Sequence, residues 1–199
     1  MRRTGMAGAG LAAAAVATTA LLAAHPSAAQ TPPDSAAGKF TLSSTDISAG
    51  GQIAESQVFN GFGCKGGNVS PALSWSNPPP GARSFALLMH DPDAPTGSGW
   101  WHWVLYNIPA SVSSLPAGAG DPHKSLLPAG ALQGRTDFGT PGYGGPCPPP
   151  GKPHRYYLRL YALKVTRLDV PADATAAYIG FTVRSQSLAK AELMGVYGR

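Results

Sequence analysis

Residues 101–108, WHWVLYNI, have the pattern of a β-strand that is buried on both faces. Side chains alternate in direction along a strand, which divides this segment into two sets. One expected face carries His102, Val104, Tyr106 and Ile108, and the other carries Trp101, Trp103 and Leu105. Because both faces are largely apolar, we expect this strand in the interior of a sheet.

Further strands are expected on both sides of this segment. The run Ser84–His90 (SFALLMH) is apolar and of strand length, which predicts a second buried strand. In His154–Val165 (HRYYLRLYALKV) polar and apolar residues alternate. The expected core face carries His154, Tyr156, Leu158, Leu160 and Ala162, and the opposite face carries Arg155, Tyr157, Arg159 and Tyr161. Shorter strand patterns occur at Phe40–Leu42, Ala72–Trp75 and Ala191–Tyr197.

Glycine and proline limit the helix content. The 199 residues include 25 Gly and 20 Pro, and both residues disfavour helix interiors. The segment Pro141–Pro153 (PGYGGPCPPPGKP) must therefore be a rigid, exposed loop. One helix is expected after Pro171, capped by Asp173, with Ala174, Ala177, Tyr178 and Phe181 at helical spacing. The predicted fold is an all-β, antiparallel two-sheet β-sandwich with one short helix near the C-terminus.

The first 29 residues have the pattern of a cleavable secretory signal. Arg2 and Arg3 precede an Ala- and Leu-rich stretch, Met6–Ala24, and small residues precede a cleavage site after Ala29. A membrane anchor is the alternative, but Ala, Gly and Thr favour insertion less than Leu, Ile or Phe do. We expect residues 30–39 to form a flexible lead-in and residues 40–199 a single domain. The mature protein would be periplasmic or secreted, without a transmembrane anchor, and the export route (Sec or twin-arginine) stays open.

The charge of the mature chain does not favour nucleic-acid binding. Removing Arg2 and Arg3 with the leader leaves 13 basic and 10 acidic residues, a net charge of +3. The remaining Lys and Arg residues are scattered singly and form no basic stripe, so nucleic acid is not expected as a partner.

Two cysteines remain in the mature chain, Cys64 and Cys147. An even number of cysteines in an oxidising compartment favours a disulfide. On the chain-entropy model such a long loop would contribute roughly 4 kcal/mol to stability. Two separate buried thiols are the alternative. Because there is no CxxC motif, neither cysteine is expected to be a redox catalyst.

Three polar groups of residues occur where predicted strands end or begin. The first is Asp91–Pro95 (DPDAP), in which two prolines stiffen the backbone around two carboxylates. The second is His102, and the third is His154 with Tyr156. If the strands pair as antiparallel neighbours, all three lie at one end of the sheet. Because a carboxylate beside a histidine favours the imidazolium, this site is expected to bind a phosphate or carboxylate group, more tightly as pH falls.

Other kinds of site are less well supported. Two histidines and a carboxylate resemble a facial metal triad, but no tight ligand spacing such as HExxH is present, and no metal is expected. A hydrolase lacks support because there is no GxSxG motif. His90 and His123 are interpreted as ordinary core or surface residues.

Several segments in this order resemble the phosphatidylethanolamine-binding protein family, also called Raf kinase inhibitor-like proteins, and most closely its exported bacterial branch. The resemblance extends from about Phe40 to Tyr197. It is carried by Asn68–Trp75 (NVSPALSW), Asp91–Pro95 (DPDAP), Gly99–Pro109 (GWWHWVLYNIP), Gln133–Gly139 (QGRTDFG), Gly142–Gly151 (GYGGPCPPPG) and His154–Tyr156 (HRY).

The resemblance implies a two-sheet antiparallel fold with an anion pocket. Its implied ligand-binding residues are Asp91, Asp93, Pro95, His102, Gly145, His154 and Tyr156. Within this set, Asp93 is expected mainly to brace its turn. Cys147 stands where better-known eukaryotic members carry glycine, so this chain departs from the family pattern in that loop. Arg135 and Asp137 belong to the bacterial pattern, and no role is assigned to them here beyond support of the site.

The resulting hypothesis is an exported, non-enzymatic binding protein without a cofactor. Its pocket would take a phosphate-type anion or phospholipid headgroup, with His102 and His154 donating hydrogen bonds, and it would present a surface to a protein partner. The alternative is a secreted inhibitor or interaction protein that acts through its loops and has a vestigial pocket. A metal-dependent hydrolase is the weaker alternative. Fold alone does not decide among them.

Overall fold

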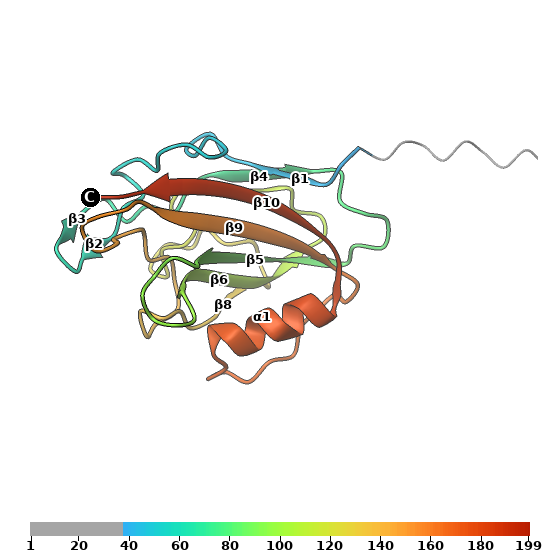
Figure 1. Cartoon of the computed structure of the whole chain (residues 1–199). Coiled ribbons are helices and arrows are strands. Elements are labelled where there is room, and N and C mark those ends of the chain that lie inside the picture. The colour runs from blue at the N-terminus through green and yellow to red at the C-terminus, as the bar shows by residue number, and fades with distance from the viewer. Residues whose placement is uncertain (1–37) are drawn as a thin grey trace, which may run out of the picture. The chain divides into compact units, whose positions relative to one another are not determined.

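Two sheets and one helix form the layers of the domain in a computed structural model that describes residues 38–199 (Figure 1). The expected leader, and the lead-in up to residue 37, lie outside the described residues. The strands are β1 (Thr41–Ser43), β2 (Asn60–Gly61), β3 (Cys64–Lys65), β4 (Leu73–Ser76), β5 (Ser84–Asp91), β6 (Trp100–Pro109), β7 (Ser114–Leu115), β8 (Leu132–Gln133), β9 (His154–Leu163) and β10 (Ser187–Tyr197), and the helix is α1 (Ala176–Ser185).

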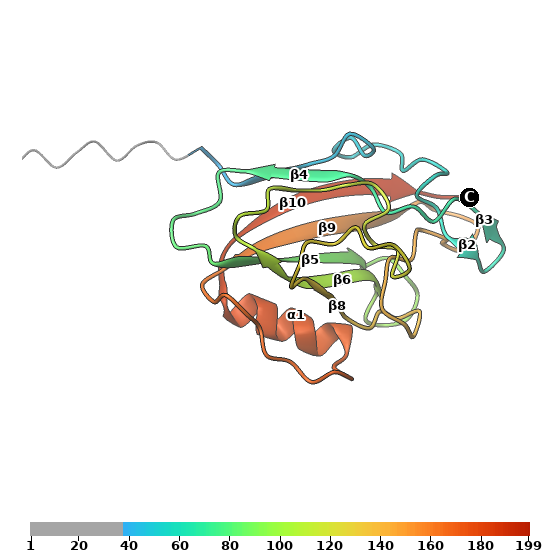
Figure 2. The same ribbon diagram turned by 180° about the vertical axis from the view of Figure 1, so that it is seen from behind.

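The larger sheet has the strand order β10-β9-β5-β6-β8, and the smaller has the order β1-β4-β7. Neighbouring strands in both sheets are antiparallel. Strands β2 and β3 form a separate short hairpin. Figures 1 and 2 show the smaller sheet over one face of the larger sheet and α1 on the other. This arrangement confirms the predicted antiparallel β-sandwich with one short helix.

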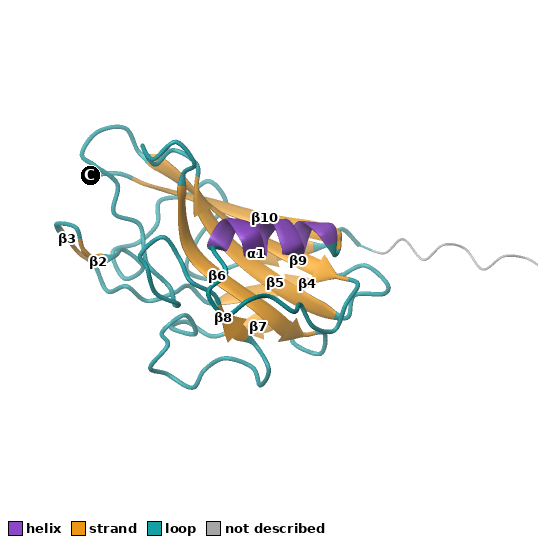
Figure 3. Ribbon diagram, turned by 90° about the horizontal axis from the view of Figure 1, so that it is seen from below, coloured by secondary structure: helices purple, strands orange, loops and turns teal. Residues whose placement is uncertain are grey.

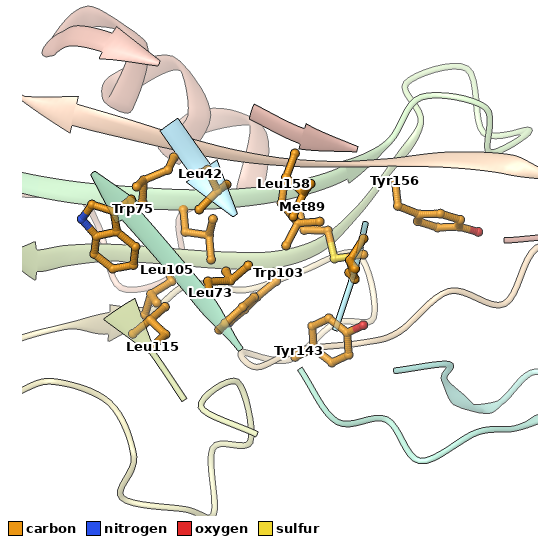
Figure 4. Packing of buried hydrophobic residues seen from close by; sticks show 14 of the residues in the cluster. Leu42, Leu73, Trp75, Met89, Trp103, Leu105, Leu115, Tyr143, Tyr156 and Leu158 are labelled. Carbon is orange, nitrogen blue, oxygen red and sulfur yellow. The ribbon is translucent and has the colours of Figure 1, made fainter. Parts of the chain in front are cut away.

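The main core lies between the two sheets. Leu42 and Trp75 of the smaller sheet belong to the same buried cluster as Trp103, Leu105 and Leu158 of the larger sheet (Figure 4). Each large apolar side chain removed from water contributes about 1.5–3 kcal/mol to folding. The alternation predicted for His154–Val165 is confirmed, because Tyr156, Leu158, Leu160 and Ala162 all lie in this core.

Strand β6 departs from the alternation expected of it. Trp101, Val104 and Tyr106 pack in the cluster beneath α1, whereas Trp103, Leu105 and Ile108 lie in the main core. The predicted faces are therefore correct for Trp103–Tyr106 and wrong for Trp101 and Ile108, which lie on the faces opposite to those expected. Two register shifts against β5 are the cause, one at His102 and one between Leu105 and Ile108. A bulge places two residues opposite one partner residue, which interrupts the period of two.

The helix was predicted in the right region but with the wrong cap and the wrong face. Thr175 caps it, and the Thr175 hydroxyl accepts a hydrogen bond from the Tyr178 amide at 3.2 Å. The buried side is made by Ala176, Ile179, Gly180 and Val183. Tyr178 and Phe181, expected on the buried face, are 50% and 72% exposed. Because the helix begins at Ala176, the residues that face the sheet are offset from those predicted.

Helix α1 lies along β5, β6 and β9 (Figure 3). A buried cluster that includes Leu88, Val104, Ile179 and Val183 joins it to the larger sheet. In residues 38–199, no helix has both the length and the apolar character needed to cross a membrane.

Candidate functional site

The three predicted polar groups lie at one end of the larger sheet. Strand β5 ends at Asp91, which pairs with Trp100 at the start of β6, and His90 pairs with Tyr157 near the start of β9. His154 opens β9 opposite Tyr197, the last residue of β10. In Figure 1 this is the end of the sheet where the C-terminus is marked. The antiparallel pairing therefore brings together side chains that are far apart in sequence.

Asp91 is a buried carboxylate that holds other parts of the site in place by hydrogen bonds. Its side chain is almost fully buried, and its Oδ1 accepts hydrogen bonds from the Asp93 and Ala94 amides at 2.8 and 3.2 Å. Its Oδ2 lies 2.8 Å from Nδ1 of His154. A carboxylate can only accept, so the His154 Nδ1 carries a hydrogen and Nε2 is the ring atom left for a ligand.

His102 is held in place by the proline-rich segment Pro141–Pro153, called the proline loop below. Its Nδ1 lies 2.7 Å from the Gly144 carbonyl oxygen, and the Gly144 amide donates to the His102 carbonyl at 2.9 Å. Its ring meets Phe138 and Tyr156 edge-to-face, with centroids 5.5 and 5.1 Å away. Burial lowers the pKa of His102 to about 4, against the opposing effects of the Gly144 carbonyl and the charge of Asp91. His102 is therefore neutral at neutral pH.

Tyr156 brings an unpaired hydroxyl to the site. Its side chain is fully buried, and the hydroxyl makes no well-formed hydrogen bond among the described residues, although the Asp91 carboxylate lies close enough to interact with it. Burial raises the pKa of Tyr156, and the nearby negative charge of Asp91 raises it further. The phenol is thus protonated throughout the working pH range and has a hydrogen to donate. A buried polar group left unpaired costs about 1–3 kcal/mol, so this hydroxyl is suited to a partner supplied from outside the chain.

These groups line one pocket of about 190 Å³. Asp91, His102, His154 and Tyr156 supply its ionisable side chains. Its other walls are mostly apolar and consist of Phe62, Ala94, Pro95, Thr96, Trp100, Phe138, Cys147, Pro148 and Pro149. A small number of polar groups within an apolar wall is typical of a small-molecule site.

The comparison with known proteins agrees with this architecture. A family model described as phosphatidylethanolamine-binding protein matches residues 43–198. The chain belongs to this family. It is 49% identical over 162 residues to YbcL of Escherichia coli (strain K12), covering 81% of this chain and 88% of YbcL. It is 46% identical over 156 residues to YbhB of the same organism, covering 78% of this chain and 98% of YbhB.

Solved structures of the phosphatidylethanolamine-binding protein family share the fold. The crystal structure of Escherichia coli YbcL superposes with a TM-score of 0.79 at 49% identity, covering 80% of this chain and 98% of that one. A putative phosphatidylethanolamine-binding protein homolog from Chlamydia trachomatis gives a TM-score of 0.67 at 34% identity, covering 80% and 97%. The resemblance identified from the motifs is thereby confirmed.

Two of the residues predicted for ligand binding do not line the pocket. Asp93 points to the surface, where Oδ1 lies 2.7 Å from Nη2 of Arg155 and Oδ2 accepts from the Arg155 amide and Nε. Gly145 is packed instead against the backbone of Gln57 and Phe59. Its amide donates to Oδ1 of Asn68 at 2.8 Å. The other five predicted residues, Asp91, Pro95, His102, His154 and Tyr156, all line the pocket.

Sequence analysis assigned Asn68 no role in the site, although it lies in one of the motifs, and named Asp137 only as support. Asn68 joins two backbone groups of the proline loop, because its Oδ1 accepts from Gly145 and its Nδ2 donates to the Tyr143 carbonyl. Its φ of 51° is one that asparagine tolerates, and its place in a glycine-rich loop was the available signal. The structure shows how Asp137 supports the site. Its Oδ2 accepts a hydrogen bond from the Trp101 amide at 2.8 Å, one residue before His102.

The predicted disulfide is confirmed. Cys64 and Cys147 are bonded, with their Cα atoms 6.0 Å apart. Cys147 lines the pocket, and Cys64 belongs to the β2–β3 hairpin that carries Phe62. The crosslink therefore joins the hairpin to the proline loop beside the pocket. Within residues 38–199, no three His, Cys, Asp or Glu side chains converge as metal ligands.

Proposed function

We propose that this protein binds a phosphate-type anion, either a phosphorylated small molecule or a phospholipid headgroup. The observation that carries the proposal is the buried Tyr156 hydroxyl, which has a hydrogen to donate and makes no well-formed hydrogen bond in the described part of the chain. It shares its pocket with the free Nε2 of His154. When the His154 ring is protonated, Nε2 becomes a charged donor, and charge-assisted hydrogen bonds to anions are the stronger kind.

The charges around the pocket support an anionic ligand. The carboxylate of Asp91 is engaged by two backbone amides and His154. Arg199 donates from Nε to the Pro148 carbonyl at 2.7 Å and from Nη2 to the Phe62 carbonyl at 3.3 Å. Because Phe62 and Pro148 both line the pocket, the guanidinium places positive charge beside its mouth. This charge would raise the local concentration of an anion.

The test is a calorimetric titration with inorganic phosphate. The variant His154→Ala should bind phosphate about tenfold more weakly than the wild type, because it loses one charge-assisted hydrogen bond. His123→Ala is a matched control, since His123 is exposed and only its backbone amide is bonded. Equal phosphate affinity in the wild type and His154→Ala, with both proteins folded, would refute the proposal.

We further propose that the protein is exported and that residues 1–29 are removed after Ala29. The Cys64–Cys147 disulfide supports this, because such bonds persist in oxidising compartments. Mass spectrometry of the protein isolated from its cells tests it. A chain that begins at Gln30 and carries no free thiol is the expected result, and an intact residue 1 on the bulk of the protein would contradict it.

The proposal includes binding without catalysis. Both cysteines are in the disulfide, so neither offers a thiolate. Within residues 38–199, no serine or threonine hydroxyl is hydrogen-bonded to a histidine. The alternative of a metal-dependent hydrolase is tested separately. One equivalent of metal bound to the purified protein, together with ester hydrolysis that a chelator abolishes, would support that alternative over binding without catalysis.

A second candidate function is protein recognition through the loops around the pocket. Phe62 favours it, because this large apolar side chain is 66% exposed at the pocket mouth. Exposed aromatic side chains are frequent anchors of protein interfaces. A partner that Phe62→Ala releases and His154→Ala retains would support this function over the anion pocket. The reverse pattern would favour the pocket.

A further inference from the structure

The hydrogen bond of His102 decides which of its ring nitrogens faces the ligand. The Gly144 carbonyl oxygen, 2.7 Å from Nδ1, can only accept a hydrogen bond, so Nδ1 must carry the hydrogen. In a neutral imidazole the other nitrogen is then a bare acceptor. Nε2 of His102 makes no hydrogen bond within residues 38–199, and the ring lines the pocket. This differs from the expected donor role of His102.

The surroundings of His102 keep the ring neutral. The backbone of Gly144 and Gly145 and the charge of Asp91 at the end of β5 favour its protonation, while His90 on the same strand opposes it. Tyr156 of β9 packs against the ring in a T-shaped arrangement, and His154 shares the pocket. Burial outweighs these effects and keeps the pKa of His102 near 4. Above about pH 5 the pocket therefore presents one acceptor nitrogen beside the donors of Tyr156 and His154.

We propose that the bare Nε2 of His102 makes this pocket selective for phosphate monoesters over phosphate diesters. The inference rests on the proposed function, since it specifies which anion the same site takes. A monoester in its singly charged form keeps one P–O–H group, which can donate to Nε2. A diester has no such hydrogen, and its anionic oxygens would meet the nitrogen lone pair. A site that pairs with a ligand hydroxyl rejects an analogue without it, because its own buried group is left unpaired.

The wild-type protein tests this with methyl phosphate and dimethyl phosphate as probes. They differ by one methyl group, and at about pH 5.5, below the monoester's second pKa of about 6, both carry mainly one negative charge. We expect methyl phosphate to bind at least about tenfold more tightly in an NMR titration. Equal affinities, or tighter binding of dimethyl phosphate, would overturn the selectivity and leave the anion pocket standing. If neither probe bound, the proposed function would fail as well.

The pH dependence gives a second readout from the same pair of probes. The complex with the monoester contains the hydrogen shared with Nε2. Below the second pKa of the monoester the ligand brings this hydrogen, and above it the complex must take one up. The preference for methyl phosphate over dimethyl phosphate should therefore fall roughly several-fold between about pH 5.5 and about pH 8. Changes elsewhere in the pocket affect both probes alike and cancel in the ratio, so a constant ratio would contradict the inference.

Two variants separate the acceptor from the pocket as a whole. In His102→Asn the amide nitrogen can replace Nδ1 in the bond to Gly144, but no acceptor remains at the position of Nε2. We expect its affinity ratio to fall to near one, through weaker binding of methyl phosphate. His154→Asn should weaken both probes and retain the preference. If His102→Asn does not fold, the ¹⁵N resonance of the wild-type His102 Nε2 decides, because a protonated Nε2 in the free protein at neutral pH would overturn the inference.

Discussion

Asp91 and His154, 63 residues apart in sequence, are joined by a hydrogen bond of 2.8 Å between Oδ2 and Nδ1. The same carboxylate fixes the turn that follows β5 by accepting from the Asp93 and Ala94 amides. One buried side chain therefore sets both the loop that forms one wall of the pocket and the orientation of the histidine opposite. The two prolines of Asp91–Pro95 stiffen this segment, which helps to hold the Asp91 carboxylate at a fixed distance from His154 on β9.

The variant Asp91→Asn should weaken phosphate binding by about tenfold and lower the free energy of unfolding by about 1–3 kcal/mol. The amide oxygen can still accept from the turn, but the amide nitrogen would face the Nδ1–H of His154. The ring must then change its tautomer or lose the bond. Calorimetry and urea unfolding measure the two effects. Asp121→Asn is the matched control, because Asp121 accepts from the His123 amide in a turn away from the pocket, and unchanged binding in Asp91→Asn would contradict this role.

The variant Asp93→Asn separates the surface ion pair from the pocket. Its phosphate affinity should stay within about twofold of the wild type, as is usual for substitutions away from a site. The hydrogen bond from Arg155 lowers the pKa of Asp93 from 3.8 to about 2. The stability that this carboxylate contributes is therefore present above pH 4 and is lost as the pH falls to about 2.

Acid unfolding of the two proteins checks this sign. The stability difference between wild type and Asp93→Asn should shrink steadily over that range, and its size is limited because the pair is exposed to solvent. A large loss of phosphate affinity in Asp93→Asn would restore Asp93 to the ligand-binding set.

The variant Gly145→Ala should destabilise the proline loop. An added Cβ would overlap the Gln57 carbonyl oxygen and lie 2.6 Å from the Phe59 amide nitrogen, which are backbone atoms that cannot move aside freely. Overpacking of this kind costs about 1–3 kcal/mol. Urea unfolding measures the loss, with Gly139→Ala compared as an exposed glycine whose Cβ would meet nothing within 4 Å but whose φ is 88°. If Gly145→Ala lost ligand affinity with no loss of stability, Gly145 would be a ligand contact after all.

Removing the disulfide with Cys64→Ser and Cys147→Ser together should cost about 2–5 kcal/mol, because the bond closes a loop over a sequence separation of 83 residues. Denaturant unfolding of the oxidised wild type and the double variant gives the difference. Phosphate affinity should fall as well, since Cys147 lines the pocket. Identical unfolding curves would mean that the hairpin and the loop are held by their other contacts.

The sequence predicted those parts of the fold that depend on local patterns. The apolar run of β5 and the alternation of β9 were found where expected. Pro141–Pro153 is a loop, as predicted, but the expectation that it is exposed was wrong for Gly142–Pro146 and Pro148, which are buried against the rest of the domain. The faces of β6 were predicted correctly only for Trp103–Tyr106, because a bulge depends on the partner strand and cannot be recognised from the sequence of one strand. The two-residue strands β7 and β8 were also missed, since two residues carry no measurable period.

The candidate site follows the same division. Residues at strand ends, such as Asp91, His102 and His154, were identifiable because antiparallel pairing determines where strand ends meet. Which ring nitrogen of His102 faces the pocket could not be predicted, because its partner is the backbone carbonyl of Gly144 and every residue has such a carbonyl. Asn68 was overlooked for a related reason, because both of its partners are backbone groups of a loop distant in sequence.

The central claim is that His102 and His154 form one anion pocket, and an NMR titration tests it most directly. Phosphoethanolamine is added to the mature protein at about pH 6 and about pH 8, and the imidazole resonances of both histidines are followed. We predict that both shift with the same half-saturation concentration and that binding is tighter at the lower pH. If neither resonance moved at either pH, the account of the pocket would be contradicted.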